Sequence, residues 1–244
     1  MNNALSRRTK QNVLLGCVVS FALALSGCSR EHAHDDGSDE SFIRVPGTAS
    51  TLSMPSGELL PLQTGARWSM TTRTASRSQN RDVSGAEEIV ITGKQAAPAP
   101  EGVIMDMRRN GKSYRQEIFL AKSDGLYMSA AGSADKMTIT PPLPLVKYPV
   151  TDGQTAVWNG ILRFKGTAAP GTSYSRVSAR ETVKTPAGSF PTYRIDTVIT
   201  TTVEGRQVSF PSTRWLSPRV GIVRQVTRAG DTRMIKELKS YQVP

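Results

Sequence analysis

Short runs in which hydrophobic and polar residues alternate follow one another along the chain from about residue 60 onward. Residues 67–73 alternate with a period of two, which is the repeat of a strand with one buried face. Residues 103–109 and 113–120 flank Asn110-Gly111, and an Asn-Gly pair predicts a hairpin because both central residues of a type I′ turn need a positive φ. Further strand-like runs are residues 88–92, 126–130, 136–140, 156–165, 174–184, 193–203, 207–215, 221–228 and 233–241.

These runs predict an all-β protein. The 20 Gly and 15 Pro are scattered between the runs, as turns would be, and hardly any segment has the length and period of a helix. We expect about ten or eleven antiparallel strands in a single, strongly curved sheet, shaped as a half-barrel or an open barrel. Residues 96–100 (AAPAP) are interpreted as a stiff loop within this one domain.

The first 27 residues have the order of a secretory signal peptide. Three basic residues precede an apolar run over residues 13–25, which is shorter than the roughly 20 residues that a spanning helix needs. The run ends in Leu-Ser-Gly-Cys at residues 25–28, which resembles the lipobox of bacterial lipoproteins. The resemblance implies cleavage between Gly27 and Cys28 and acylation of Cys28, which would anchor the protein firmly to a membrane. The alternative is a plain signal peptide in which Cys28 is an incidental thiol.

Two further features place the folded domain. Residue 29 is Ser and not the Asp that resembles an inner-membrane retention signal, so we expect a cell-envelope lipoprotein at the outer membrane, facing the periplasm. Residues 28–57 hold two basic and five acidic residues among small and polar ones, and predict a disordered acidic tether. Residues 58–244 then form a single β-rich domain. This domain carries the whole net charge of +11, because the positive charge of the signal peptide and the negative charge of the tether cancel.

The distribution of Cys and His excludes most catalytic chemistry. Cys17 and Cys28 are the two cysteines, and His32 and His34 lie in the predicted tether, so neither residue type occurs from residue 37 onward. A Ser-His-Asp triad, a Cys-His pair and the usual zinc sites each need one of these residues in a folded pocket. Residues 133–136 (SADK) match the S-x-x-K spacing of penicillin-recognising enzymes, but they lie between predicted strands and not on a helix. We therefore predict no catalytic residue, no metal site and no cofactor.

Several phrases along the domain occur together in a recognisable order. They are residues 60–68 (LPLQTGARW), 143–145 (LPL) with 153–158 (GQTAVW), 183–190 (VKTPAGSF) with Tyr193, and 215–223 (WLSPRVGIV). The set resembles an uncharacterised bacterial lipoprotein family with a β half-barrel domain similar to that of periplasmic lipoprotein carriers. The resemblance implies an apolar or amphiphilic ligand, or a lipoprotein, in the concave face of the sheet. Trp68, Trp158 and Trp215 then become candidates for lining that face, although we favour core and turn roles for all three.

The pI of about 10.0 raises the question of a polyanionic partner. Export makes nucleic acid an unsuitable partner, so we expect none. Anionic lipid headgroups or acidic envelope polymers are the alternatives, and the opposing explanation is scattered, solvated charge. The candidate contacts are Arg73, Arg77 and Arg81, which recur every four residues, and Arg108, Arg109, Lys112 and Arg115, which flank the Asn-Gly turn.

Three hypotheses for the function follow. The first is a non-enzymatic envelope lipoprotein that binds its ligand in the concave sheet. The second is a structural or assembly module that holds a partner protein or cell-wall polymer through a sheet edge or basic loops. The third is a carboxylate-dependent hydrolase, which requires two acids to converge in one pocket from among Asp106, Glu117, Asp152, Asp196 and Glu204.

Overall fold

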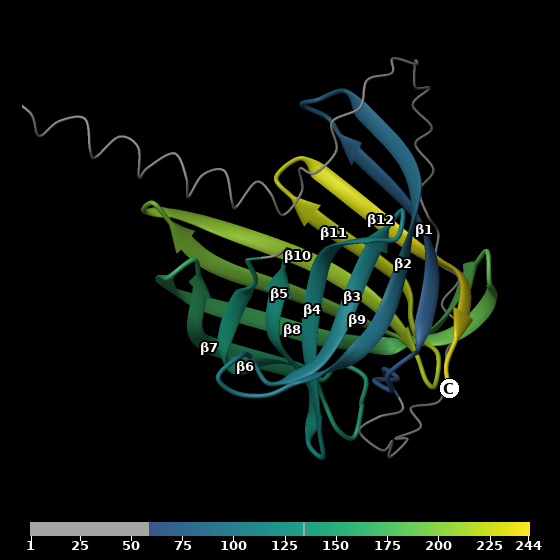
Figure 1. The fold of residues 1–244 in the computed structure, drawn as a ribbon, viewed down its shortest axis with the longest axis horizontal. Coiled ribbons are helices and arrows are strands. Elements are labelled where there is room, and N and C mark those ends of the chain that lie inside the picture. The colour runs from purple at the N-terminus through teal and green to yellow at the C-terminus, as the bar shows by residue number, and fades with distance from the viewer. Residues whose placement is uncertain (1–58, 134) are drawn as a thin grey trace, which may run out of the picture.

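Twelve antiparallel strands form one closed barrel in the computed structural model, which describes residues 59–133 and 135–244. Each strand lies between its neighbours in sequence, and β1 pairs with β12 to close the barrel (Figure 1). None of these described residues belongs to a helix that could cross a membrane. The strands are β1 (Arg67–Ser76), β2 (Arg81–Gln95), β3 (Gly102–Arg109), β4 (Lys112–Lys122), β5 (Gly125–Gly132), β6 (Met137–Lys147), β7 (Thr155–Phe164), β8 (Thr167–Thr185), β9 (Gly188–Val203), β10 (Arg206–Ser217), β11 (Gly221–Ala229) and β12 (Thr232–Gln242).

The all-β class and the single, strongly curved antiparallel sheet are confirmed. The curvature goes further than a half-barrel, because the first and last strands meet, with Arg67 opposite Gln242 and Ser76 opposite Thr232. The strand number is twelve. Every run identified in the sequence falls in one of these strands, with at most one residue of the run outside it, but most strands extend beyond the run, as β2 does by starting at Arg81.

Asn-Gly and similar pairs make the tight turns. Asn110 and Gly111 have φ angles of 52° and 73°, which confirms the predicted hairpin between β3 and β4. The pairs Lys165-Gly166 and Glu204-Gly205 adopt the same left-handed conformation between β7 and β8 and between β9 and β10. Glycine follows a non-glycine residue in each pair, and the right-handed twist of the strands selects this turn type.

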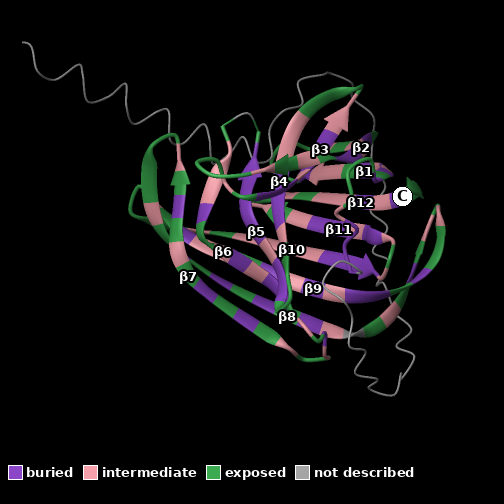
Figure 2. Ribbon diagram, turned by 60° about the horizontal axis from the view of Figure 1, so that its bottom comes forward, coloured by how far each residue is buried: buried purple, intermediate pink, exposed green. Residues whose placement is uncertain are grey.

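The hydrophobic core lies inside the barrel. Buried and exposed residues alternate along the strands, as the bands on β7 and β8 show (Figure 2). On β1 the inward positions are Trp68, Met70 and Thr72, all buried. The segment before β1 adds Leu59 and Leu60, which are buried in the same core cluster as the residues lining the barrel.

Strands β6 and β7 form the weakest pairing in the barrel. Only three positions of β6, Thr138 to Thr140, are opposite residues of β7. Pro141, Pro142 and Pro144 follow in β6, and proline has no N–H to give to a sheet ladder. The indole Nε1 of Trp158 on β7 instead donates to the carbonyl oxygen of Pro141 at 2.8 Å. A side chain thus joins the two strands where the backbone ladder stops.

Candidate functional site

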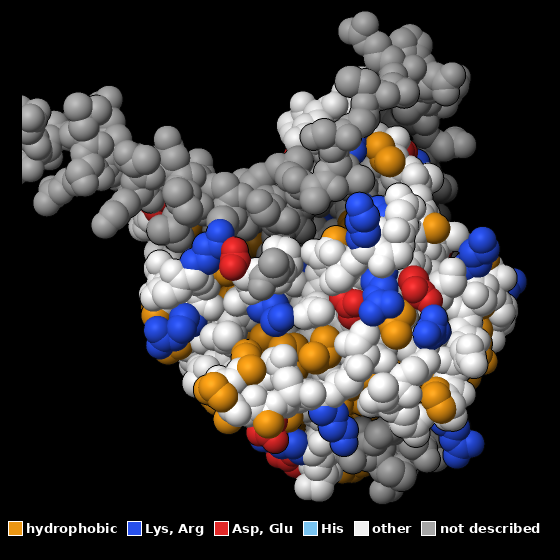
Figure 3. Space-filling view, in the orientation of Figure 1, with side chains coloured by type: hydrophobic (Ala, Val, Ile, Leu, Met, Phe, Trp, Pro, Cys, Tyr) orange, Lys and Arg blue, Asp and Glu red, His pale blue; other side chains and the backbone are white. Residues whose placement is uncertain are grey.

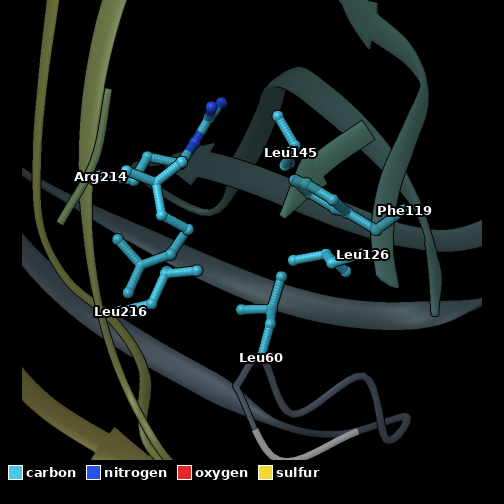
Figure 4. A pocket seen from close by; sticks show the side chains of 8 residues that line it. Leu60, Phe119, Leu126, Leu145, Arg214 and Leu216 are labelled. Carbon is cyan, nitrogen blue, oxygen red and sulfur yellow. The ribbon is translucent and has the colours of Figure 1, made fainter. Parts of the chain in front are cut away.

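The inside of the barrel, where we expected the ligand, is filled by side chains. Leu60, Phe119, Leu126, Leu145 and Leu216 point towards one another there, with Arg214 at one side (Figure 4). The cavity between them measures about 10 Å³. That volume is about what one water molecule requires. A lipid in this position would have to displace core side chains.

Charged side chains share the interior with this apolar cluster. Glu117 on β4 is buried and accepts hydrogen bonds from Arg115 at 2.9 Å and from Arg214 on β10 at 3.3 Å. Burial opposes the ionisation of Glu117, but the two guanidinium groups outweigh it and lower its pKa to about 2. Glu117 is therefore a carboxylate at neutral pH, locked between two arginines.

A second buried ion pair lies on the neighbouring part of the wall. Lys236 on β12 contacts Glu87 on β2 at 2.5 Å, and both side chains are fully buried. Tyr114 donates a hydrogen bond to the other oxygen of Glu87, and the guanidinium of Arg109 lies 4.8 Å from the centre of the Tyr114 ring. Burial lowers the pKa of Lys236, and the nearby Glu87 acts against that shift. Glu87 thus joins Lys236, Tyr114 and Arg109 in one polar network, in which the cations outnumber the acid.

A larger hollow lies on the outer face of strands β9 to β12. It has a volume of about 330 Å³, within the range of small-molecule sites. We call it the outer groove. It is lined by Arg194, Asp196, Thr197, Val198, Pro211, Ser212, Thr213, Trp215, Arg224, Val226, Arg228 and Arg233.

Trp215 forms the back of the outer groove. Its neighbours Arg214 and Leu216 point into the barrel, so the alternation of β10 turns Trp215 outward. The guanidinium groups of Arg194 on β9 and Arg224 on β11 lie 5.7 and 5.2 Å from its ring centre, and its exposed fraction is only 5%. Its Nε1 donates to Glu181 of β8. The Trp215 indole is thus held in place by its hydrogen bond to Glu181, and two guanidinium groups pack against its ring.

The four arginines of the groove differ in their partners. Arg194 is paired with Asp196 at 3.1 Å, and Arg224 with Glu237 at 3.5 Å. Arg228 on β11 and Arg233 on β12 are exposed and stand directly opposite each other across the two strands. No acid in residues 59–133 or 135–244 forms an ion pair with either. Like charges in directly opposite positions destabilise a sheet, so this pair of cations favours an anion between them.

The three tryptophans take different places. Trp68 lies inside the barrel, where its Nε1 donates to the carbonyl oxygen of Val220 at 2.5 Å. Trp158 is also buried, against the β6–β7 pairing described above. Neither lines one of the two cavities described here, whereas Trp215 lines the outer groove. Of the three candidates for ligand contact, only Trp215 therefore lies at a cavity described here.

The predicted basic contacts do not share one face. Arg73 and Arg81 lie on strands β1 and β2, with Arg77 in the turn between them, and Arg73 pairs with Asp82 at 2.6 Å. Around the other hairpin, Arg108 pairs with Asp106 outside the barrel, while Arg109 and Arg115 pair inward with Glu87 and Glu117. Lys112 is exposed at the start of β4. Figure 3 shows one face of the molecule, on which Lys and Arg are scattered among other side chains.

The acids named for a hydrolase are separated as well. Asp106 pairs with Gln116 and Glu117 with Met105, which places the two carboxylates on opposite faces of the sheet. Asp196 is the one acid that lines the outer groove, Asp152 lies between β6 and β7, and Glu204 is in the turn after β9. Within the described residues, no three His, Cys, Asp or Glu side chains are placed to hold a metal ion.

Apart from Trp215 and Asp196, the residues that line the groove are not singled out by the sequence. Arg194, Arg224, Arg228 and Arg233 are spread over three strands, and only the strand register brings them together. The sequence did contain one indication of the groove. Residues 224–228 alternate, which places Arg224 and Arg228 on the same face as Val226. The tether and Gly27, Cys28, His32 and His34 lie outside the described residues. In the closed barrel, each of the twelve described strands has a neighbour on both sides, although the β6–β7 ladder covers only three positions and leaves the rest of that edge without a backbone partner.

Comparisons with known proteins find one partial family match and several similar solved structures. Residues 172–235 match a family model described as DUF3108-like. The sequence matches no curated protein. Among solved structures, a protein from Bacteroides fragilis named as exported and of YmcC-like fold is 15% identical, with a TM-score of 0.44 over 76% of this chain and 99% of that one.

Two further solved structures have a similar chain path. One is named as a lipoprotein, from Parabacteroides distasonis, at 14% identity and a TM-score of 0.45, covering 76% of this chain and 98% of that chain. The other is the hypothetical lipoprotein YmcC from Escherichia coli, at 12% identity and a TM-score of 0.34, covering 72% and 85%.

Proposed function

We propose that this protein is a non-enzymatic binding protein of the bacterial cell envelope, anchored by lipid on Cys28, which takes up an anionic amphiphile in the outer groove. The observation that carries the proposal is the pair of opposed cations Arg228 and Arg233 at the rim of a 330 Å³ hollow. The signal sequence and the Leu-Ser-Gly-Cys motif support the anchor. The placement of the candidate acids on opposite faces of the sheet and in separate loops supports a role without catalysis.

The composition of the groove defines the ligand class. Its lining has four arginines and one aspartate, and the apolar contributions come from Trp215, Val226, Val198 and Pro211. An anion gains charge-assisted hydrogen bonds from the guanidinium groups, each worth about 1.5–3 kcal/mol. An uncharged apolar ligand would leave the opposed charges of Arg228 and Arg233 uncompensated. A molecule with an acidic head and an apolar segment satisfies both parts of the lining.

The test uses octyl phosphate as a probe in isothermal titration calorimetry. In the double variant Arg228→Gln/Arg233→Gln we expect about 100-fold weaker binding, because two charge-assisted contacts are removed. The matched control is Arg73→Gln/Arg77→Gln, which removes the same number of charges from the β1–β2 hairpin and should change binding less than twofold. Equal weakening in both double variants would show nonspecific charge attraction and contradict the proposal. Octyl glucoside, which has the same chain and no charge, should not bind measurably.

A further inference from the structure

A row of apolar side chains crosses the outer face of the barrel beside the groove. Val157 on β7 is opposite Tyr174 on β8, Tyr174 is opposite Val198 on β9, and Val198 is opposite Pro211 on β10. We call these four residues the apolar row. Val157, Tyr174 and Val198 have exposed fractions of 66%, 49% and 38%, so three of the five large hydrophobic residues exposed in the described chain stand in one line.

The apolar row runs directly into the outer groove. Val198 and Pro211 belong to the row and also line the groove, beside Arg228 and Arg233. Polar residues border the row on both sides: Arg176 and Asp196 pair on one side, and Thr172 and Thr200 on the other. The surface therefore has a cationic end, from which the apolar row runs at right angles to the strands.

The cationic end fits a phosphate better than a carboxylate. Arg228 and Arg233 oppose each other on neighbouring strands, so their side chains begin about 5 Å apart. A phosphate monoester carries up to two negative charges and three terminal oxygens, and can therefore accept hydrogen bonds from both guanidinium groups at once. A carboxylate carries one charge and two oxygens, so it offers two opposed arginines less charge and fewer acceptor oxygens than a phosphate does.

From this arrangement we infer that the ligand is a single phosphate-bearing lipid, with its phosphate between Arg228 and Arg233 and its hydrocarbon chain along the apolar row. This inference rests on the proposed function and adds the headgroup class and the direction of the chain. Four adjacent strands span about 14 Å, so a decyl chain that starts at the phosphate covers part of the row and a longer acyl chain covers more of it. The concave groove favours one lipid molecule over a flat bilayer surface, which would not fill a hollow of 330 Å³.

The experiment measures binding of butyl, hexyl, octyl and decyl phosphate below their micellar concentrations. Complete burial of a methylene strengthens binding about fourfold, and a chain lying on an open row is buried on one side, so we expect about twofold for each methylene. In Val198→Thr/Tyr174→Thr, which keeps good strand-forming residues, affinity should rise much less along the series. Binding of inorganic phosphate should stay unchanged in that variant.

The control variant is Ile161→Thr, since Ile161 is an exposed apolar residue of β7 that lies outside the row. It should keep the full dependence on chain length. A chain-length dependence that is the same in the wild type and in Val198→Thr/Tyr174→Thr would overturn the inference while leaving the Arg-dependent binding of the proposed function intact. Binding to phosphatidylglycerol vesicles without binding of monomeric alkyl phosphates would also overturn it. Failure of every phosphate probe to bind the wild type would instead refute the proposed function itself.

Discussion

Buried charge is the feature of single residues that most affects this barrel. Glu117 is buried, and the favourable contacts of its carboxylate come from Arg115 and Arg214. Removing one member of such a group leaves the others buried without compensation, which typically costs 3–5 kcal/mol. The packing around Arg115 and Arg214 therefore depends on the ionised state of Glu117.

This dependence predicts how stability changes with pH. The pKa of Glu117 falls from 4.5 in the unfolded chain to about 2 in the barrel. A lowered pKa contributes stability that is complete above pH 4.5 and is lost as the pH falls from there towards 2. In Glu117→Gln we expect the free energy of unfolding to drop by about 3 kcal/mol at pH 7 and to change less between pH 5 and pH 2 than in the wild type.

Urea unfolding at a series of pH values measures both effects. Glu204→Gln is the matched control, since Glu204 is exposed in the turn between β9 and β10. It should leave the free energy of unfolding and its pH profile nearly unchanged. An acid profile of Glu117→Gln that coincides with that of the wild type would show that another group controls the acid response.

At the scale of elements, the pairing of β6 with β7 depends on close approach. A Cβ at Gly160 of β7 would lie under 3.0 Å from the Thr140 carbonyl oxygen of β6 and from the Trp158 ring. Thr140 is the last residue of β6 with a partner on β7, and Trp158 makes the side-chain bond that follows. Glycine at position 160 is therefore required by space and not by its backbone angle.

Gly160→Ala is expected to destabilise the protein by about 2 kcal/mol, because overpacking pushes the backbones apart or turns the indole. Hydrogen exchange should quicken at Thr138 and Thr140 more than in β9. Asn159→Ala, at the exposed neighbouring position, is the control and should change both measurements little. A uniform loss of protection over all strands would show that the pairing is not a local weak point.

The strands were predictable from the sequence, and the interior charges were not. Alternation is a local signal, so the runs around Asn110-Gly111 and Glu204-Gly205 identified both hairpins. Nothing in the sequence indicates that Lys236 is buried, because a lysine within a strand normally faces solvent, whereas its place opposite Thr72 and Gln225 turns it inward. The outer groove was equally hidden, since Arg228 and Arg233 become a pair only through the register of β11 with β12.

For the whole molecule, closure decides which surfaces can bind. An open half-barrel would offer a concave face and two sheet edges, and both were expected here to meet a ligand or partner. In the barrel the concave face becomes a packed interior with a cavity of about 10 Å³, and β1 and β12 pair along their length. Recognition moves to the outside, where the groove and the apolar row lie across β7 to β12.

Closure of the barrel brings the two ends of the domain together. Because Arg67 and Gln242 are partners across β1 and β12, the two ends of the domain lie side by side, and a short Gly-Ser linker can join Pro244 to Leu59. A circular permutant of the domain with new ends between Asn110 and Gly111 should then fold with a wild-type circular dichroism spectrum and bind octyl phosphate with unchanged affinity. Opening the same ring at Gly160, within the β6–β7 pairing, should yield insoluble protein. Because the strands form a closed ring, the fold allows the chain termini to lie in a turn other than the natural one.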